Sequence, residues 1–219
     1  MTAKHSIADS LFSGGMLRKE QRSAPLTAAA TLLILTVAAV SGNTARDTVS
    51  RASFIREVID VTISGDNSFR VTGTYHFTGR PNTRYPIIYP FPIDMNHCKP
   101  ITIELVQDSS SLSFTSNEEG DALRFRIRFD KDGRGAFTIT YEQKTKEPFG
   151  TYILTSTEAW NKPLEHAVYR VTVFDSILLD HLNWSIDTVY QQSTNFVYAL
   201  EREDIMPDRN LVFRWKKSE

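Results

Sequence analysis

The feature that most constrains the fold is a strict two-residue alternation between Leu123 and Phe129. The segment reads Leu-Arg-Phe-Arg-Ile-Arg-Phe, so an apolar side chain stands at every second position and an arginine stands between each pair. Successive side chains of a β-strand point to opposite faces of a sheet. The pattern therefore predicts a half-buried strand, with Arg124, Arg126 and Arg128 in line on the face opposite the core.

A second alternating segment follows after a short polar loop. Phe137, Ile139 and Tyr141 alternate with polar residues, and the loop 130–134 is short enough to join two antiparallel strands. We expect a hairpin in which Ile127 lies opposite Phe137. A slip of one residue would place arginines opposite apolar side chains, so the pattern specifies the register.

Short runs of β-branched and aromatic residues continue along the chain from Phe54 onward. The chain holds 13 Phe, 8 Tyr and 3 Trp, which are residue types that pack well on a pleated surface. Two short segments, 175–182 and 203–207, are possible helices. The predicted strands lie at about 54–63, 68–78, 84–91, 100–107, 111–116, 122–129, 135–143, 151–157, 167–174, 182–191, 195–202 and 210–215. The sequence predicts an all-β fold, an antiparallel immunoglobulin-like β-sandwich of roughly 9 to 12 strands, preceded by one N-terminal hydrophobic helix.

The N-terminal part of the chain has the layout of an export signal. Residues 26–40 carry no charge, and the basic residues Arg18, Lys19 and Arg22 come shortly before them. The apolar run is short for a membrane-spanning helix, so we weigh two outcomes: a cleaved signal peptide, or a retained signal anchor. Positive charge ahead of an apolar run keeps the N-terminus in the cytoplasm, so both outcomes place the β domain on the extracytoplasmic side.

These observations divide the chain into four parts. Residues 1–15 are either a flexible extension or the result of a mis-assigned start codon, in which case the protein begins at Met16 and not at Met1. Residues 16–41 are the signal peptide or signal anchor, residues 42–53 are a linker, and residues 54–219 are the β-sandwich domain.

Charge and cysteine content exclude several classes of function. Outside residues 1–41 the chain carries 21 basic and 24 acidic residues. This part of the chain therefore lacks the excess of basic residues that is typical of nucleic-acid-binding proteins. The single cysteine, Cys98, cannot form an intramolecular disulfide. The five histidines form no close pair, so we predict neither a metal site nor a cofactor.

Catalytic motifs are lacking as well. The sequence has no Gly-x-Ser-x-Gly turn, no phosphate-binding glycine loop and no dinucleotide fingerprint. We therefore predict no catalytic residues.

Two segments are candidates for binding or for packing. The arginine row Arg124, Arg126 and Arg128 is either an ordinary solvated face or a docking surface for an anionic glycan, a lipid headgroup or an acidic protein. The segment 85–92 carries three prolines, and proline cannot donate to a strand ladder, so this segment is an edge strand or a cover over the sheet. Its aromatic residues Tyr85, Tyr89 and Phe91 could alternatively form a binding strip.

A Trp-bearing loop follows the predicted strand 151–157, and we expect Trp160 to plug one end of the sandwich, with Pro163 in a structural role. The order of residues here, Tyr-Ile-Leu-Thr at 152–155, then Trp160, Pro163-Leu164 and Ala167, resembles uncharacterised exported bacterial β-sandwich domains of unknown function. The resemblance implies an envelope location and an immunoglobulin-like architecture, and it implies no catalytic residues.

We therefore predict an exported or membrane-anchored, non-catalytic module that binds or scaffolds an unknown envelope component. Two alternatives stay open, an envelope hydrolase whose active site is built from loops, and a membrane-tethered accessory subunit of a larger complex.

The leader generates the first testable prediction. If the apolar run is a cleaved signal, the product in the expressing cell is a soluble species that begins near Gly42, because the small residues Ala39 and Ser41 precede that position. Cell fractionation and intact-mass measurement check this. A membrane-bound species that retains residues 26–40 would instead establish an anchor.

Overall fold

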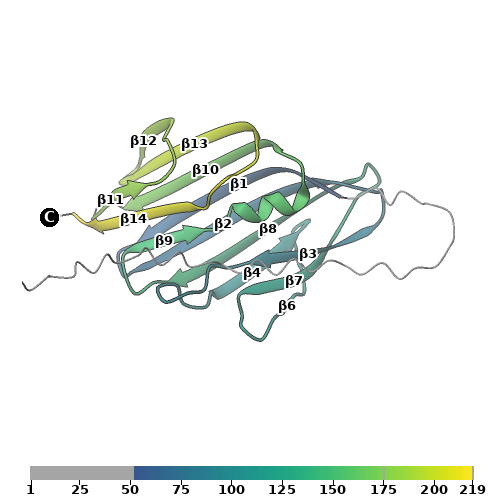
Figure 1. The fold of residues 1–219 in the computed structure, drawn as a ribbon, viewed down its shortest axis with the longest axis horizontal. Coiled ribbons are helices and arrows are strands. Elements are labelled where there is room, and N and C mark those ends of the chain that lie inside the picture. Colours follow the sequence, from purple (N-terminus) through teal and green to yellow (C-terminus); the bar gives the residue numbers. More distant parts are fainter. Residues whose placement is uncertain (1–51, 175, 219) are drawn as a thin grey trace, which may run out of the picture. The chain divides into compact units, whose positions relative to one another are not determined.

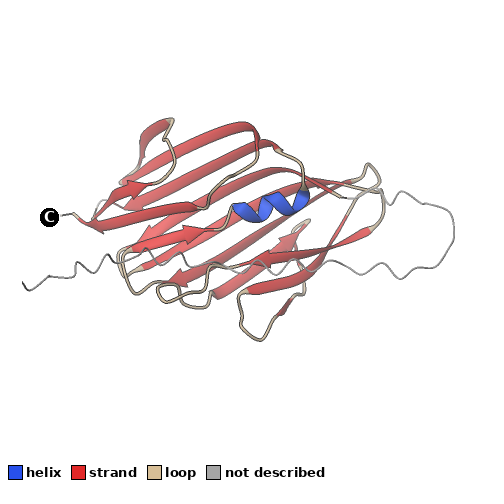
Figure 2. Cartoon of the chain, viewed as in Figure 1, coloured by secondary structure: helices blue, strands red, loops and turns tan. Residues whose placement is uncertain are grey.

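A computed structural model describes residues 52–174 and 176–218, and its strands confirm the all-β prediction. This part of the chain contains fourteen strands and one short 3-10 helix, η1 (Thr155–Trp160) (Figure 2). The predicted extension, the leader and most of the linker lie outside the described residues. No helix within the described ranges is both long and apolar enough to cross a membrane.

Eight strands form one large sheet (Figure 1). In spatial order they are β12 (Thr188–Gln192), β13 (Asn195–Ile205), β10 (Leu164–Phe174), β1 (Ser53–Ser64), β2 (Ser68–Thr78), β8 (Arg134–Lys144), β4 (Ile101–Gln107) and β5 (Ser110–Ser111). Neighbouring strands are antiparallel except for β1 and β10, which run parallel from the pair Arg56 and His166 to the pair Ile63 and Val173. This pair departs from the antiparallel arrangement that the sequence predicted.

Two three-stranded sheets pack against one face of the large sheet. The first contains β11 (Ile177–Leu182), β14 (Leu211–Lys217) and β9 (Phe149–Tyr152), and the second contains β3 (Arg84–Pro90), β7 (Ala122–Arg128) and β6 (Thr115–Ser116). Phe213 of β14 meets Phe69 of β2 with ring centroids 5.1 Å apart, and Phe125 of β7 meets Phe137 of β8 at 4.9 Å. Phe69 and Phe137 point into the same core, so the two small sheets cover the same face.

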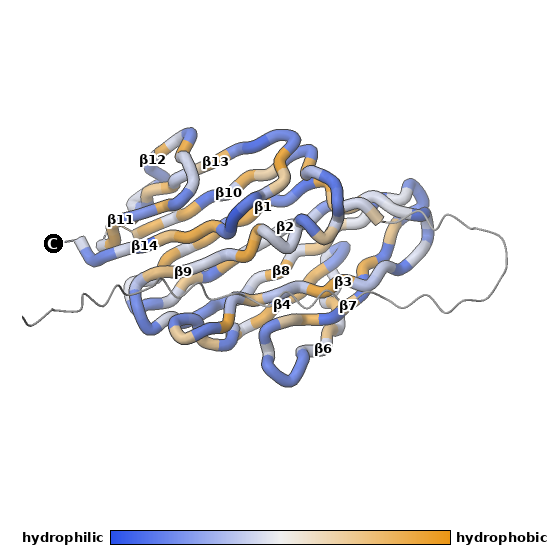
Figure 3. Tube along the Cα trace, viewed as in Figure 1, coloured by the Kyte–Doolittle hydropathy of each residue, from blue (hydrophilic) through white to orange (hydrophobic). Residues whose placement is uncertain are grey.

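The core follows the alternation that the sequence shows. Along β10, every second residue from Ala167 to Val173 is buried, and along β7 Leu123, Phe125 and Ile127 are buried. Figure 3 shows the same alternation as hydrophobic and hydrophilic colours along these two strands. The layered, sandwich-like architecture results from burying these apolar rows against one another.

The predicted hairpin between the two alternating segments is wrong. β7 pairs with β3 and β6, whereas β8 pairs with β2 and β4. The apolar rows of β7 and β8 face each other across the core and do not lie side by side. Alternation identifies the buried face of a strand, but it does not identify the strand's neighbours, and both arrangements bury the same side chains.

Four further predicted elements are corrected. The segment 175–182 is not a helix, because Ile177–Leu182 forms β11. The predicted strand 182–191 is broken by a loop ahead of β12, and the possible helix at 203–207 is partly the end of β13. The predicted strand 151–157 ends at Tyr152 and is followed by η1.

The contact between the small sheet and the large sheet can be tested at Phe125. Phe125→Ala removes a buried ring that packs edge-on against Phe137, so we expect the free energy of unfolding to fall by about 3 to 5 kcal/mol. Urea denaturation measures this. The neighbouring Arg124→Ala variant, at an exposed position of the same strand, is the control and should change stability by less than about 0.5 kcal/mol.

Candidate functional site

Four arginines share the outer face of the small sheet that contains β3 and β7. Arg124, Arg126 and Arg128 are exposed along β7, as the sequence predicted, and Arg84 at the start of β3 lies directly opposite Arg128. We call these four residues the arginine face. The backbone positions of successive arginines on one strand face are about 6.8 Å apart, so the three arginines of β7 form a row.

The arginine face has little compensating negative charge. Arg128 forms one ion pair, in which its Nη2 atom lies 3.4 Å from Oδ2 of Asp108, and both side chains are about two-thirds exposed. No described carboxylate lies within 4.0 Å of a side-chain nitrogen of Arg84, Arg124 or Arg126. Because like charges directly across two strands are destabilising, the Arg84 and Arg128 pair favours contact with an anion.

Apolar side chains lie between the arginines. Pro86 stands opposite Arg126, and Ile88, which is 57% exposed, stands opposite Arg124. The face therefore combines fixed positive charge with apolar contact area.

A groove of about 560 Å³ adjoins the arginine face at the end of β7. Its polar lining residues are His76, Thr78, Asn82, Gln107, Asp108, Arg128, Asp130 and Arg134. Arg128 belongs both to the groove and to the arginine face, whereas His76 and Thr78 in the lining of the groove lie on the side of the large sheet that points away from the core. The arginine face, with the groove beside Arg128, is the candidate functional site.

The backbone of Arg128 is held in place by a side chain from the large sheet. Nε2 of Gln107 donates to the carbonyl oxygen of Arg128, and the backbone N–H of Arg128 donates to Oε1 of Gln107, both at 2.8 Å. Gln107 is buried in β4. The amide takes the place of a strand neighbour and joins the two sheets at the groove.

Two further groups define the charge of the groove. Hydrogen bonds from the backbone N–H of Arg134 and of Asp132 hold the pKa of the Asp130 carboxyl below its usual range. Burial lowers the pKa of His76, and the charge of Arg56 lowers it further, so His76 is neutral at pH 7. The positive charges in the groove at that pH are therefore Arg128 and Arg134.

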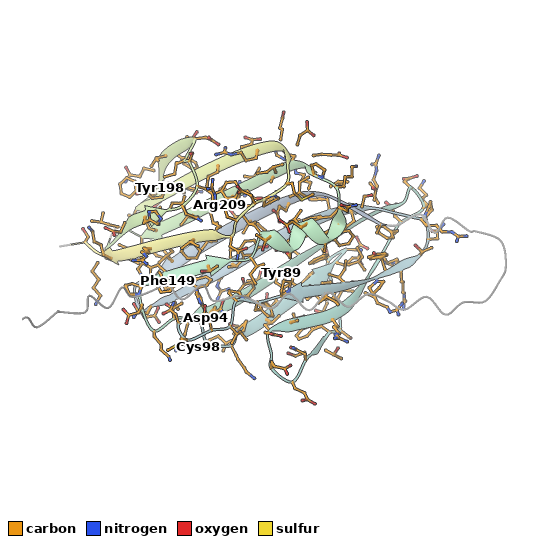
Figure 4. The ribbon with its side chains drawn as sticks, viewed as in Figure 1. Tyr89, Asp94, Cys98, Phe149, Tyr198 and Arg209 are labelled. Atoms are coloured by element: carbon orange, nitrogen blue, oxygen red, sulfur yellow. The ribbon has the colours of Figure 1, made fainter. Side chains whose placement is uncertain are left out.

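The other candidates from the sequence lie at different depths. Tyr89 and Phe91 are buried, at 6% and 3% exposure, and Tyr85 is half-buried. β3 is an edge strand, as expected of a segment with three prolines. Tyr89 lies between the small sheet and the large one (Figure 4), so its side chain belongs to the core and not to a surface strip.

The Trp-bearing loop forms η1. The Trp160 ring packs against Phe54, Phe77 and Tyr85, with centroids 5.9, 5.2 and 5.8 Å away, so Trp160 covers the core at this position. Pro163 is exposed just before β10.

A buried polar cluster lies beneath η1. Glu57 is 2% exposed, and its Oε1 atom accepts a hydrogen bond of 2.6 Å from the Tyr169 hydroxyl. Burial raises the pKa of Glu57 to about 7, although the hydrogen bond from Tyr169 favours the charged form.

Three tyrosine hydroxyls meet in the same region. The hydroxyl of Tyr75 hydrogen-bonds to that of Tyr89 at 2.9 Å and to that of Tyr152. Burial raises the pKa of all three phenols well above the ordinary value, so they stay protonated. With Glu57 they line a cavity of about 50 Å³, which has room for a few water molecules.

The lining of this cavity includes a single carboxyl group, Glu57, three tyrosines and no histidine. No group of three His, Cys, Asp or Glu side chains within the described ranges is placed to hold a metal ion.

The remaining titratable cluster lies near β9. Nδ1 of His97 is 2.9 Å from Oδ1 of Asp94, and the buried His97 ring packs edge-on against Phe69 and Phe149. Asp94, Cys98 and Phe149 are labelled in Figure 4. Cys98 is exposed and has a free thiol.

The sequence prediction missed Glu57, Gln107 and Arg84. A signal existed for Glu57, because Ile59, Val61 and Ile63 alternate and the same period places Glu57 on the core face. Arg84 has the same phase as the exposed Ile88 in β3, which could have placed it on the outer face. Nothing in the sequence indicated the role of Gln107, which depends on a contact between two sheets.

Comparisons with known proteins show similarity only at the level of the fold. A structure from Legionella pneumophila, provisionally described as a nutrient binding protein, is 13% identical to this chain, with a TM-score of 0.57, and the match covers 76% of this chain and 67% of that one. An M1 zinc metallopeptidase from Deinococcus radiodurans is 8% identical, with a TM-score of 0.48 and coverage of 76% and 43%, so this chain spans less than half of its length. No protein-family model matches the sequence, and no curated protein matches it. At these identities, the Legionella structure supports the all-β architecture alone.

The buried Glu57 predicts a specific dependence of stability on pH. Its pKa is about 7 in the folded state against an ordinary value of 4.5, so the folded state binds the proton more tightly than the unfolded state does. Stability should therefore fall as pH rises from about 4.5 through about 7, and the full cost, about 3 kcal/mol, applies above pH 7.

Glu57→Gln removes the titration and keeps an oxygen that can accept the bond from Tyr169. We expect the variant to be more stable than the parent protein at pH 8 by up to about 3 kcal/mol, with the difference vanishing near pH 4.5. Urea denaturation across this range measures it, and Glu118→Gln, at an exposed position, is the control. An unchanged pH slope in the Glu57→Gln variant would show that Glu57 does not titrate in this range.

Proposed function

We propose that this chain is a non-catalytic β-sandwich module of the cell envelope that binds an anionic glycan through the arginine face and the adjoining groove. The observation that carries the proposal is the row of arginines on one solvent-facing sheet surface, of which Arg84, Arg124 and Arg126 have no described carboxylate within ion-pair distance. Arginine suits this role because its planar guanidinium binds carboxylate or sulfate oxygens in pairs.

The geometry favours an extended chain of negative charges over a single small anion. The backbone positions of Arg124, Arg126 and Arg128 repeat along one strand at about 6.8 Å, and Pro86 and Ile88 supply apolar surface beside them. A linear glycan with one acidic group on each sugar can place its charges along this row while its rings contact the apolar side chains.

Location and fold family belong to the same proposal. The basic and apolar leader supports export, with the β domain on the extracytoplasmic side. The layered packing of the sheets supports the sandwich architecture, and the immunoglobulin-like topology stays a prediction from the sequence. The similarity to a structure provisionally described as a nutrient binding protein is compatible with a binding role.

Binding can be tested with polygalacturonate, a linear polymer of acidic sugars, by isothermal titration calorimetry at low and at physiological salt. We expect the parent protein to bind, and binding to weaken as salt rises, because the charges are exposed to solvent. Arg124→Gln with Arg126→Gln should weaken binding by at least about tenfold.

The control is Lys216→Gln with Lys217→Gln, which removes the same charge from exposed positions of β14. This variant should change affinity by less than about twofold. The proposal fails if the parent protein does not bind polygalacturonate, or if the control loses as much affinity as the arginine variant. Binding to anionic lipid vesicles but not to the polymer would replace the glycan with a membrane surface.

A further inference from the structure

The large sheet ends on a strand with no neighbour on one side among the described residues. β12 is the last strand in the sheet order and pairs with β13 alone. All five of its residues, Thr-Val-Tyr-Gln-Gln, are exposed, and none is charged or proline. An unpaired strand edge presents backbone N–H and C=O groups that can accept another strand.

The other free edges have features that prevent such pairing. β3 carries Arg84 and two prolines, and β11 carries Asp180 and His181 with a register shift between Leu179 and His181. β5 and β6 are two residues long, and the Asn96 side chain bonds to Phe149 at the start of β9. Charge, proline, bulges and short length are the devices by which proteins protect sheet edges. Of the free edges in the described ranges, β9 and β12 lack charge, proline and bulges, but the Asn96 side chain already bonds to the start of β9, and β12 has no such contact.

The segment of sequence that contains this edge is rich in exposed apolar side chains. Of the ten large hydrophobic side chains that are exposed in the described part of the chain, six lie between residues 174 and 196. They are Phe174, Leu178, Ile186, Val189, Tyr190 and Phe196. Val189 is 52% exposed and lies opposite Tyr198 of β13, which is labelled in Figure 4.

We propose that two copies of this chain associate by antiparallel pairing of β12 with β12, which joins their large sheets into one. A twofold axis at Tyr190 places Val189 opposite Gln191 and Thr188 opposite Gln192, so no like charges meet. The nearest carboxylate, Asp187, is already engaged, since its Oδ2 atom accepts hydrogen bonds from the Glu201 backbone N–H and from the Arg202 guanidinium. The edge is therefore self-complementary, which is the requirement for a symmetric dimer.

The size of the edge sets the strength of the pairing. Each copy contributes a five-residue strand and the apolar side chains beside it. Interfaces this small support weak association, so we expect a dimer whose population rises with protein concentration. This inference is independent of glycan binding, because the arginine face lies on a different sheet.

Sedimentation velocity of the full chain over a range of concentrations tests the proposal. We expect the parent protein to shift from monomer to dimer as concentration rises. Val189→Lys places a charge on the edge, and two such charges face the pairing region of a dimer, so the dimer dissociation constant should rise by at least about tenfold.

The matched control is Ile88→Lys, which introduces the same charge at a similarly exposed hydrophobic position of β3. It should leave the dimer dissociation constant within about twofold of the parent value. Thermal denaturation confirms that both variants are folded. Three results would overturn the proposal: the parent protein stays monomeric, Val189→Lys leaves the dimer intact, or both variants weaken the dimer equally. A dimer that Val189→Lys leaves intact would point to association through the apolar run at 26–40.

Discussion

The core face of the eight-stranded sheet has to be covered along its width, and no other sheet in the described part of the chain has more than three strands. Two small sheets therefore share the task, one built around β14 and the other around β7. Aromatic rings make the contact in both places, through Phe213 on Phe69 and Phe125 on Phe137. Dispersion and the burial of apolar surface are the main stabilising terms, and the shapes of the rings determine where each small sheet sits.

Because two separate small sheets cover the core, the chain passes between sheets at several places where backbone N–H and C=O groups have no partner on a neighbouring strand. Side-chain amides satisfy several of them: Gln107 pairs with the backbone of Arg128, Asn96 bonds to Phe149 and Glu147, and the Asn210 oxygen accepts from the backbone of Leu154. A buried polar group without a partner costs free energy, so these amides are required wherever the chain passes between sheets. The buried Glu57 and its tyrosine neighbours belong to the same interior. Burying Glu57 costs more free energy than burying an amide, because its carboxyl group must either stay protonated or be buried with its charge.

The same constraint shapes the surface. Once β7 buries Leu123, Phe125 and Ile127, its three arginines have to face solvent, and the pairing of β3 with β7 brings Arg84 alongside them. The groove arises where Gln107 links the edge of the large sheet to this small sheet. The arginine face is thus a direct consequence of how the core is covered, and β12 ends the large sheet with no neighbour on one side among the described residues.

The sequence by itself located most of the strands and the buried side of most of them, because a period of two is a local property of the chain. It identified Arg124, Arg126 and Arg128 as an outward row, and it predicted that the proline-bearing segment of β3 is an edge strand or a cover over the sheet. Only the tertiary structure decided that β7 and β8 face each other across the core, that β1 and β10 pair in parallel, and that Arg84 and Arg134 join the candidate site. β7 and β8 bury the same side chains whether they pair in one sheet or face each other across the core. The choice between these arrangements depends on contacts between residues far apart in the sequence, which a local pattern does not record.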